Sequence, residues 1–454
     1  MFEKNFLKYK HKIALKEKNI KIYYFDLLKY STLFKKILKQ NSLTFLICEN
    51  KIGSIVSYTS LINNKLPVCL IDINISNDDL LKLVSLFNPK YIIYNKKKNF
   101  SFLKLKVNKI FNLYNFHVVE ITNSKKFYIS KKILLLLSTS GSLNEPKFVK
   151  LSQKNLETNT KGIIKYLGIN SSDATITTMP MHYSYGLSII NSHLYSGGKI
   201  ILTEEGLISK KFYKIVKKEN ITNFNGVPFI YEILLKIGLE KIICKSLRFL
   251  TQAGGSLSKD KILNIYNLLK NNDISFFTMY GQTEASPRIS YLLINENELK
   301  KDNLSIGKPI EGGKLYLSKQ NEIIFMGQNI YGGYSNNYKD LKNYKKIIKL
   351  STQDIGFKNE YNEIYIAGRV NRSIKVYGHR VNLDYLEKKI EEIFKCNSAV
   401  IFKEKKIIIF SEKIIQPSKL TNLQSNIFKN IVLSKIPLNK NMKKNYSILQ
   451  SSKF

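Results

Sequence analysis

The chain has 454 residues, 44% of them hydrophobic, and its 73 basic and 34 acidic residues give a formal net charge of +39. This length predicts more than one domain with ample core, and the hydrophobic content is ordinary for a globular protein. No apolar run approaches the ~20 residues of a transmembrane helix, which argues against membrane insertion. The segment from Met1 to Phe6 lacks the apolar stretch of a secretory signal, so we expect a cytoplasmic protein.

The metal-ligating side chains show no spacing typical of a metal site. The sequence has four cysteines, which are far apart and form no C-x-x-C pair, and five histidines without H-x-x-x-H or H-E-x-x-H spacing. We therefore expect reduced core cysteines and no structural transition-metal site.

The positive charge raises the alternative of a nucleic-acid-binding protein. The lysines are scattered along the whole chain, and the longest basic runs, such as residues 96–98, are short. This distribution favours a generally basic, solvated surface that attracts anionic substrates, and we expect no nucleic-acid partner.

Taken in chain order, apolar runs with strand character alternate with helical stretches up to about residue 307. The expected strands are residues 43–48, 68–73, 91–94, 133–137, 148–151, 199–202 and 246–251, and the expected helices include 77–87 and 258–269. This alternation predicts an α/β fold, with a large N-terminal body of layered sheets and helices.

The remainder of the chain changes to shorter elements. We expect strands at 314–317, 322–325 and 363–366, a helix at 383–394, strands at 399–402 and 406–410, and then another helix and a polar tail. The predicted domains are residues 1–368 and a small, mobile α+β domain of residues 369–454.

The most informative segment is the turn that follows the apolar strand at 133–137. It contains Thr139, Ser140, Gly141 and Ser142 and ends in Lys147. Backbone N–H groups and hydroxyls in such a turn can donate hydrogen bonds to a polyphosphate, and the lysine adds a positive charge. The turn lacks the Gly-Lys-Ser/Thr end of a Walker loop. A strand is expected directly after it, so the turn should join two strands.

This turn resembles the phosphate loop of the adenylate-forming superfamily, T-S-G-[ST]-T-G-x-P-K-G-V. That superfamily includes acyl-CoA synthetases, amino-acid adenylation domains, D-alanine–carrier ligases and luciferases. The chain keeps the family's residues at 139–142, 146, 147 and 149, and departs from the pattern at Leu143, Asn144 and Phe148.

Further motifs follow in the family's order. Tyr280-Gly281-Gln282-Thr283-Glu284 resembles Y-G-x-T-E, Thr352-Gln353-Asp354 resembles T-G-D, and residues 368–381 resemble G-R-x-[DK]-x-x-I-K-x-x-G-x-R-I. Glu387 stands where the family has a helix glutamate, and residues 437–443 resemble P-x-x-x-x-G-K with Met442 in place of glycine. Weaker matches are Gly254-Gly255 and residues 180–186, where Tyr183 takes the position of the family's histidine.

The resemblance implies ATP-dependent activation of a carboxylate as an acyl- or aminoacyl-adenylate, with pyrophosphate release and transfer to a thiol. It implies ATP and Mg²⁺, a small carboxylic or amino acid, and a separate acyl carrier protein or CoA. The implied catalytic residues are Lys443, Thr283 and Glu284, with Glu284 on Mg²⁺. The implied nucleotide-binding residues are Thr139, Ser140, Gly141, Ser142, Lys147, Gly254, Gly255, Tyr280, Gly281, Asp354, Arg369 and Lys375, and the acid pocket holds Tyr183, Tyr185 and Gly186.

The resemblance also implies a domain rotation about Asn371. This rotation would withdraw Lys443 after adenylation and bring the loop at 378–381 to the site for thiol attack.

The competing hypothesis is a catalytically degenerate, nucleotide-binding regulatory member of the same fold. Asn144, Phe148 and Met442 replace glycines that give phosphate loops their space or conformation. The chemically active side chains all remain, so we expect an enzyme.

Overall fold

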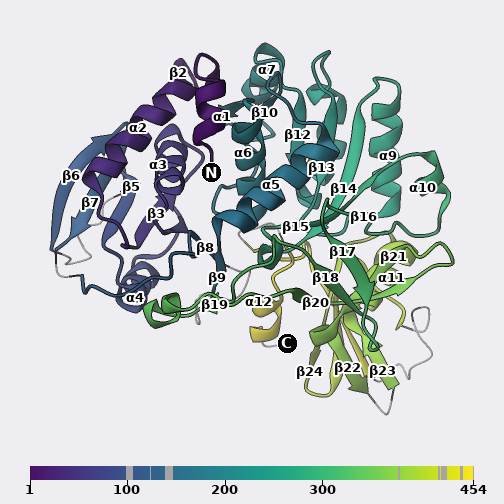
Figure 1. Ribbon diagram of the computed structural model, residues 1–454. Coiled ribbons are helices and arrows are strands. Elements are labelled where there is room, and N and C mark those ends of the chain that lie inside the picture. Colours follow the sequence, from purple (N-terminus) through teal and green to yellow (C-terminus); the bar gives the residue numbers. More distant parts are fainter. Residues whose placement is uncertain are drawn as a thin grey trace.

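The computed structural model describes residues 1–98, 106–122, 124–138, 147–376, 379–417, 420, 427–439 and 443–452. Two large sheets form most of the N-terminal body, and shorter sheets and helices of the C-terminal region lie beneath the second one (Figure 1). This arrangement confirms the predicted α/β fold class with layered sheets. The domain boundary at residue 368 stays a prediction.

The first large sheet brings together the strands on either side of the predicted phosphate loop. Its order is β19 (Tyr334–Ser335), β9 (Phe148–Leu151), β8 (Leu135–Ser138), β4 (Val68–Asp72), β3 (Thr44–Cys48), β5 (Tyr91–Asn95), β7 (Phe116–Ile121) and β6 (Val107–Leu113). β8 and β9 pair antiparallel, with Ser138 opposite Phe148. The loop therefore joins two strands, as predicted, although Thr139, Ser140, Gly141 and Ser142 lie outside the described residues.

Helices cover both faces of this sheet. They are α1 (Glu3–Lys8), α2 (Tyr24–Ile37), α3 (Ile52–Asn63) and α4 (Asn77–Phe87). The predicted helix at 77–87 is confirmed to the residue, because local signals mark both of its ends. The Ser76 hydroxyl accepts the Asp79 N–H, and Asn88 ends the helix in the left-handed conformation with φ of 47°.

The second large sheet carries part of the predicted site, because Tyr280 and Gly281 end one of its strands and Gly254 and Gly255 follow another. Its order is β16 (Lys308–Pro309), β15 (Arg288–Leu293), β14 (Ser275–Gly281), β13 (Phe249–Gln252), β12 (Asn223–Gly226), β10 (Ala174–Ile176), β11 (Lys199–Leu202), β1 (Ile13–Glu17) and β2 (Ile20–Tyr23). Its helices are α5 (Gln153–Leu167), α6 (Ser184–Ser196), α7 (Lys210–Lys218), α8 (Pro228–Ile237), α9 (Lys259–Lys270) and α10 (Glu296–Lys300). The strand expected at 246–251 begins later, at Phe249, because Leu247 N–H bonds to the Cys244 carbonyl in a turn.

A third sheet leads into the C-terminal region. Its strands are β17 (Lys314–Leu317), β18 (Glu322–Met326), β20 (Lys349–Lys358) and β21 (Ile364–Arg369). The C-terminal elements are β22 (Ser373–Val376), β23 (His379–Asn382), α11 (Leu383–Phe394), β24 (Ser398–Lys403), β25 (Lys406–Ser411), β26 (Phe428–Val432) and α12 (Tyr446–Ser451).

The predicted helix at 383–394 is confirmed as α11. The helix predicted after the strand at 406–410 falls largely on residues 418–419 and 421–426, which lie outside the described residues, and the next regular elements after β25 that are described are β26 and the short α12. β26 pairs in parallel with β25, and this long-range pairing leaves no local pattern in the sequence.

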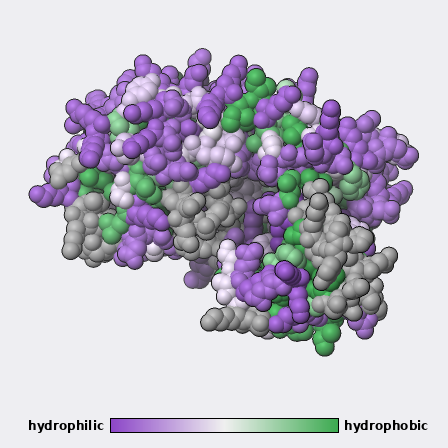
Figure 2. Space-filling view, turned by 90° about the horizontal axis from the view of Figure 1, so that it is seen from below, coloured by the Kyte–Doolittle hydropathy of each residue, from purple (hydrophilic) through white to green (hydrophobic). Residues whose placement is uncertain are grey.

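The surface agrees with the charge of the chain. Seen from below, it carries mainly hydrophilic residues, with separate hydrophobic patches (Figure 2). Within the described part of the chain, no helix is both long and apolar enough to cross a lipid bilayer.

Candidate active site

Three predicted nucleotide-binding residues lie in contact, Tyr280 near the end of β14, Asp354 in β20 and Arg369 at the end of β21. The Tyr280 hydroxyl donates a short hydrogen bond to Asp354 Oδ2, and Arg369 Nε lies 3.2 Å from Asp354 Oδ1. Sheet pairing produces this contact, because Asp354 stands directly opposite Arg369 in the β20–β21 register. An aromatic ring, a carboxylate and a guanidinium thus lie together, which suits a nucleoside with its ribose hydroxyls.

Burial controls the ionisation of Asp354. Desolvation raises the pKa of this carboxyl above its ordinary 3.8, although the Arg369 charge and the Tyr280 hydrogen bond oppose the rise. Burial also raises the pKa of Tyr280, so its hydroxyl stays protonated and continues to donate to Asp354.

Gln353, which stands where the T-G-D pattern has glycine, adopts a backbone conformation that favours glycine. Its backbone is left-handed, with φ of 63°, and its N–H donates to Glu322 Oε1 at 2.9 Å. A non-glycine residue in this conformation costs about 1–2 kcal/mol. The carboxylate of Glu322 offsets part of that cost, so the turn that presents Asp354 is preserved.

A second cluster lies beside the predicted phosphate loop. Lys147 Nζ lies 3.6 Å from the centroid of the Tyr334 ring, and the Tyr334 hydroxyl donates to Glu284 Oε1 at 2.8 Å. Tyr334 belongs to β19, which pairs with β9 directly after Lys147. The structure therefore brings the loop lysine and the predicted magnesium glutamate to one place through Tyr334, a residue that the motifs did not single out as a site residue.

Glu284 is the carboxylate available for magnesium at this place. The described residues contain no group of three or more His, Cys, Asp or Glu that could hold a metal ion. A single carboxylate still fits Mg²⁺, which is usually held by one or two carboxylates together with substrate phosphates and water. Next to Glu284, the Thr283 hydroxyl lies 3.3 Å from Ser184 Oγ, at the start of α6.

Lys443 reaches the predicted acid pocket from the C-terminal region. Its Nζ lies 5.8 Å from the centroid of the Tyr183 ring, within the range of a cation–π contact. The Tyr183 hydroxyl in turn lies against Gly254, where an added Cβ would be 2.8 Å from it and φ is +86°. Glycine at 254 thus makes room for Tyr183, and the structure brings Gly254, Tyr183 and Lys443 together.

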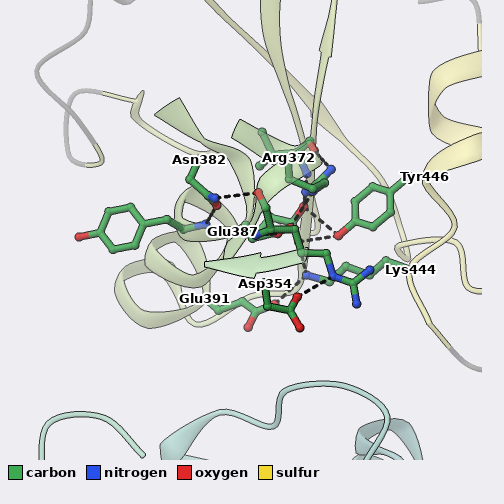
Figure 3. Close-up of polar contacts among 11 residues, drawn as sticks. Asp354, Arg372, Asn382, Glu387, Glu391, Lys444 and Tyr446 are labelled. Atoms are coloured by element: carbon green, nitrogen blue, oxygen red, sulfur yellow. Dashed lines mark hydrogen bonds and ion pairs between the residues drawn. The ribbon is translucent and has the colours of Figure 1, made fainter. Parts of the chain in front are cut away.

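The backbone next to Lys443 is anchored at Lys444 by a cluster of side chains that surrounds the buried Glu387 of α11 (Figure 3). Glu387 accepts hydrogen bonds from Lys444 Nζ at 2.7 Å, from the Tyr446 hydroxyl at 2.9 Å and from the Val400 N–H at 2.8 Å, and it also pairs closely with Arg372. Burial opposes the charged form of Lys444, but the carboxylates of Glu387 and Glu391 outweigh it and raise its pKa.

This cluster connects the segment after Arg369 to the residue next to Lys443. Of its members, only Glu387 was indicated by the sequence. In the sequence, the one feature that could have indicated this cluster is that Lys444 directly follows Lys443.

The remaining predicted residues have structural roles or lie outside the described part. At Gly186 an added Cβ would lie 2.2 Å from the Pro180 carbonyl, and at Gly281 it would lie 2.0 Å from the Pro287 carbonyl, so both positions need glycine for space. Tyr185 is buried and its hydroxyl bonds to Thr251. Gly255 packs on Pro228. The side chain of Lys375, like Gly378 and Met442, is outside the described part of the chain.

The site is defined by these groups and not by the volume of a cavity. A cavity of about 720 Å³ elsewhere on the body is lined by residues that include seven lysines and none of the predicted site residues.

Comparisons with known proteins identify the family of the chain. A family model described as "AMP-binding enzyme" matches residues 3–334. Oxalate–CoA ligase of Arabidopsis thaliana is 27% identical over 261 residues, which is 55% of this chain and 50% of that protein. D-Alanine–D-alanyl carrier protein ligase of Bacillus licheniformis is 22% identical over 376 residues, 78% of this chain and 74% of that protein.

Among solved structures, O-succinylbenzoate coenzyme A synthetase from Bacillus subtilis, in complex with ATP and magnesium ion, has a TM-score of 0.75 at 16% identity. That match covers 97% of both chains and shows a shared fold. The chain spans about half the length of the first curated relatives that it matches. Because the family model matches residues 3–334, which is more than half of the sequence, this chain belongs to the AMP-binding enzyme family.

Proposed function

We propose that the protein is an ATP-dependent acid–thiol ligase that works in two steps. In the first, an oxygen of the substrate carboxylate attacks the α-phosphorus of ATP, the bond from that phosphorus to the bridging oxygen breaks, and pyrophosphate leaves. In the second, a thiol attacks the acyl carbon, AMP leaves and a thioester forms. The observation that carries this proposal is the approach of Lys443 to Tyr183, beside Gly254.

Each cluster has a defined task in the first step. Asp354 accepts the ribose hydroxyls and Tyr280 gives adenine an aromatic face. The loop that ends at Lys147 holds the β- and γ-phosphates. Lys443 contacts both the carboxylate and the α-phosphate, so that the two anions can approach each other.

Magnesium held by Glu284 supplies charge neutralisation on the phosphates. Thr283, beside Ser184, is positioned to bond a phosphate oxygen. The hydrogen bond from Tyr334 orients the Glu284 carboxylate for the metal.

We extend the proposal to the second step and to the partners by analogy with the same family. The small C-terminal domain, from residue 369 onward, rotates about Asn371 and withdraws Lys443 so that the thiol can enter. The substrate is a small carboxylic or amino acid, and the thiol belongs to a separate carrier protein or to CoA. A chain of charge +39 attracts an acidic carrier protein. We place the protein in the cytoplasm.

Acid-dependent exchange of pyrophosphate with ATP tests the adenylation step. We expect exchange with at least one small acid, dependence on Mg²⁺, and a loss of about 10²–10³-fold in Lys443→Ala, the scale of removing one contact that stabilises the transition state. Lys429→Ala, on the exposed edge of β26, is the matched control and should leave the rate unchanged. Unchanged exchange in Lys443→Ala would refute the role of Lys443, and the absence of exchange with every acid would favour the degenerate alternative.

A further inference from the structure

The short turn that follows Glu284 is held by two buried asparagine side chains. Asn329 Nδ2 donates to the Ala285 carbonyl at 2.6 Å and to the Arg288 carbonyl at 2.8 Å. Asn159 Nδ2 donates to the same two carbonyls, at 3.2 Å and 3.1 Å. Both asparagines are 1% exposed. Two amides from distant parts of the chain, one in α5 and one between β18 and β19, therefore hold both ends of this turn.

The turn depends on these amides because its surroundings are apolar. Ala285 packs in a buried cluster with Ile289 and Phe325. A buried carbonyl without a donor is unfavourable, since it has given up its hydrogen bonds to water. An asparagine amide has two N–H hydrogens, so each of the two side chains can serve both carbonyls at once.

The segment that carries Asn329 makes further contacts with the same turn. The Tyr331 N–H donates to the Glu284 carbonyl at 2.9 Å. The Ser286 hydroxyl donates to the Asn329 carbonyl at 2.7 Å. The segment is thus bonded to the backbone of the predicted magnesium ligand itself, and also to the turn that follows it.

Helix α5 fixes both partners of this contact. Asn155 and Asn159 are four residues apart and therefore lie on the same face of the helix. Asn155 is 4% exposed, and its Nδ2 donates to the Gln328 and Ile330 carbonyls, each at 2.7 Å. One face of α5 therefore holds the segment through one asparagine and the turn through the other.

The turn lies directly after two groups that the proposed reaction uses. The Thr283 hydroxyl approaches Ser184 Oγ, and Tyr334 donates to the Glu284 carboxylate. The hydrogen bond from Tyr334 orients only the carboxylate group. The path of the main chain on which Thr283 and Glu284 stand is set by the contacts of the turn.

We propose that Asn329 and Asn159 are positioning residues, which set the backbone of Thr283 and Glu284 for magnesium and the phosphates. This inference rests on the proposed function, because it assigns residues to the metal end of that site. A fully bonded network of buried polar groups makes its surroundings rigid and specifies one arrangement. Groups that orient a metal ligand in this way usually affect metal affinity or activity about 10–100-fold.

Calorimetric titration of the full chain with ATP, with and without Mg²⁺, tests the proposal without relying on turnover. In the wild type, Mg²⁺ should tighten the binding of ATP. Asn329→Leu nearly keeps the volume but removes the donors, and should reduce this gain in affinity about 10-fold while metal-free ATP binding stays the same. Asn159→Leu should act in the same direction but less strongly, because its hydrogen bonds are longer.

The double variant shows whether the two asparagines share one task. Each single variant leaves one of the two amides on each carbonyl, whereas the double variant leaves neither. The loss in the double variant should therefore exceed the product of the two single losses.

Asn191→Leu is the matched control for a structural role. Asn191 is 3% exposed and accepts a hydrogen bond from the Tyr58 hydroxyl at 3.0 Å, between α6 and α3. This variant should lower the melting temperature, as the others do, but leave the effect of Mg²⁺ on ATP binding unchanged.

An unchanged effect of Mg²⁺ in Asn329→Leu and Asn159→Leu, or an equal loss in Asn191→Leu, overturns the proposal. A wild-type chain that binds ATP equally well with and without Mg²⁺ also overturns it. If the double variant or Asn329→Leu fails to fold, Asn159→Leu decides. Pyrophosphate exchange by the wild type tests the proposed function separately, so the failure of either proposal can be recognised without the other.

Discussion

The charge cluster around Glu387 gives a prediction that can be calculated from the structure. The Glu387 side chain is 6% exposed and holds two cations, Arg372 and Lys444, that are 14% and 27% exposed. Glu387→Gln keeps the size of the side chain but removes its charge. Breaking a buried ion pair by removing one partner costs about 3–5 kcal/mol, since the remaining charge is left unpaired.

The expected loss lies at the lower end of that range. Arg372 retains Asp384 at 2.7 Å, and Lys444 retains Glu391 at 3.1 Å. We therefore expect Glu387→Gln to destabilise the C-terminal region by about 3 kcal/mol. Because Lys444 adjoins Lys443, the pyrophosphate exchange rate should fall as well.

The assay is urea unfolding, combined with hydrogen exchange on peptides that cover residues 369–454. Glu392→Gln on the same helix is the matched control, since Glu392 is 56% exposed and its pair with Lys388 spans 3.9 Å. An exposed pair of this kind is worth at most about 1 kcal/mol. Equal unfolding midpoints and equal protection for the two variants would refute the reasoning.

Three other predictions concern the nucleotide side of the site. Phe148 is buried and packs edge-on to Phe87, with ring centroids 5.1 Å apart. Phe148→Gly, which restores the family residue, should lower the free energy of unfolding in urea by about 3–5 kcal/mol without lowering the KM for ATP. A lower KM would show that Phe148 impairs the phosphate loop. Tyr334→Phe keeps the ring beside Lys147 but removes the hydroxyl that donates to Glu284. The Mg²⁺ concentration for half-maximal exchange should therefore rise about 10-fold. An unchanged Mg²⁺ requirement would contradict the orienting role of Tyr334. In the folded protein the pKa of Asp354 is raised above its ordinary 3.8. The protonated carboxyl therefore stabilises the folded state at a pH below about 3.8, and this stabilisation is lost as the pH rises through the pKa of the folded state. Because the proposed ribose binding uses the ionised carboxylate, the KM for ATP should increase toward acidic pH with an inflection above 3.8, and Asp354→Asn should abolish that inflection.

The sequence alone was sufficient for the elements that carry their own signals. The helix at 77–87 has a serine cap, buried residues at helical spacing and an asparagine at its end, and the strand at 148–151 is a continuous buried run. The order of the motifs from Thr139 to Lys443 indicated the family, because each motif is a short run of residues with a defined chemistry.

Tertiary structure decided how those motifs meet. Tyr280 and Asp354 are 74 residues apart, and Glu387 and Lys444 are 57 apart. Their contacts depend on strand register and packing between distant segments, which leave no periodic pattern in the chain. The sequence thus determined the type of chemistry and the side chains that can perform it. The folded structure decided which of these side chains act together, because the ionisation and the strength of each charged group depend on its burial and on its partners.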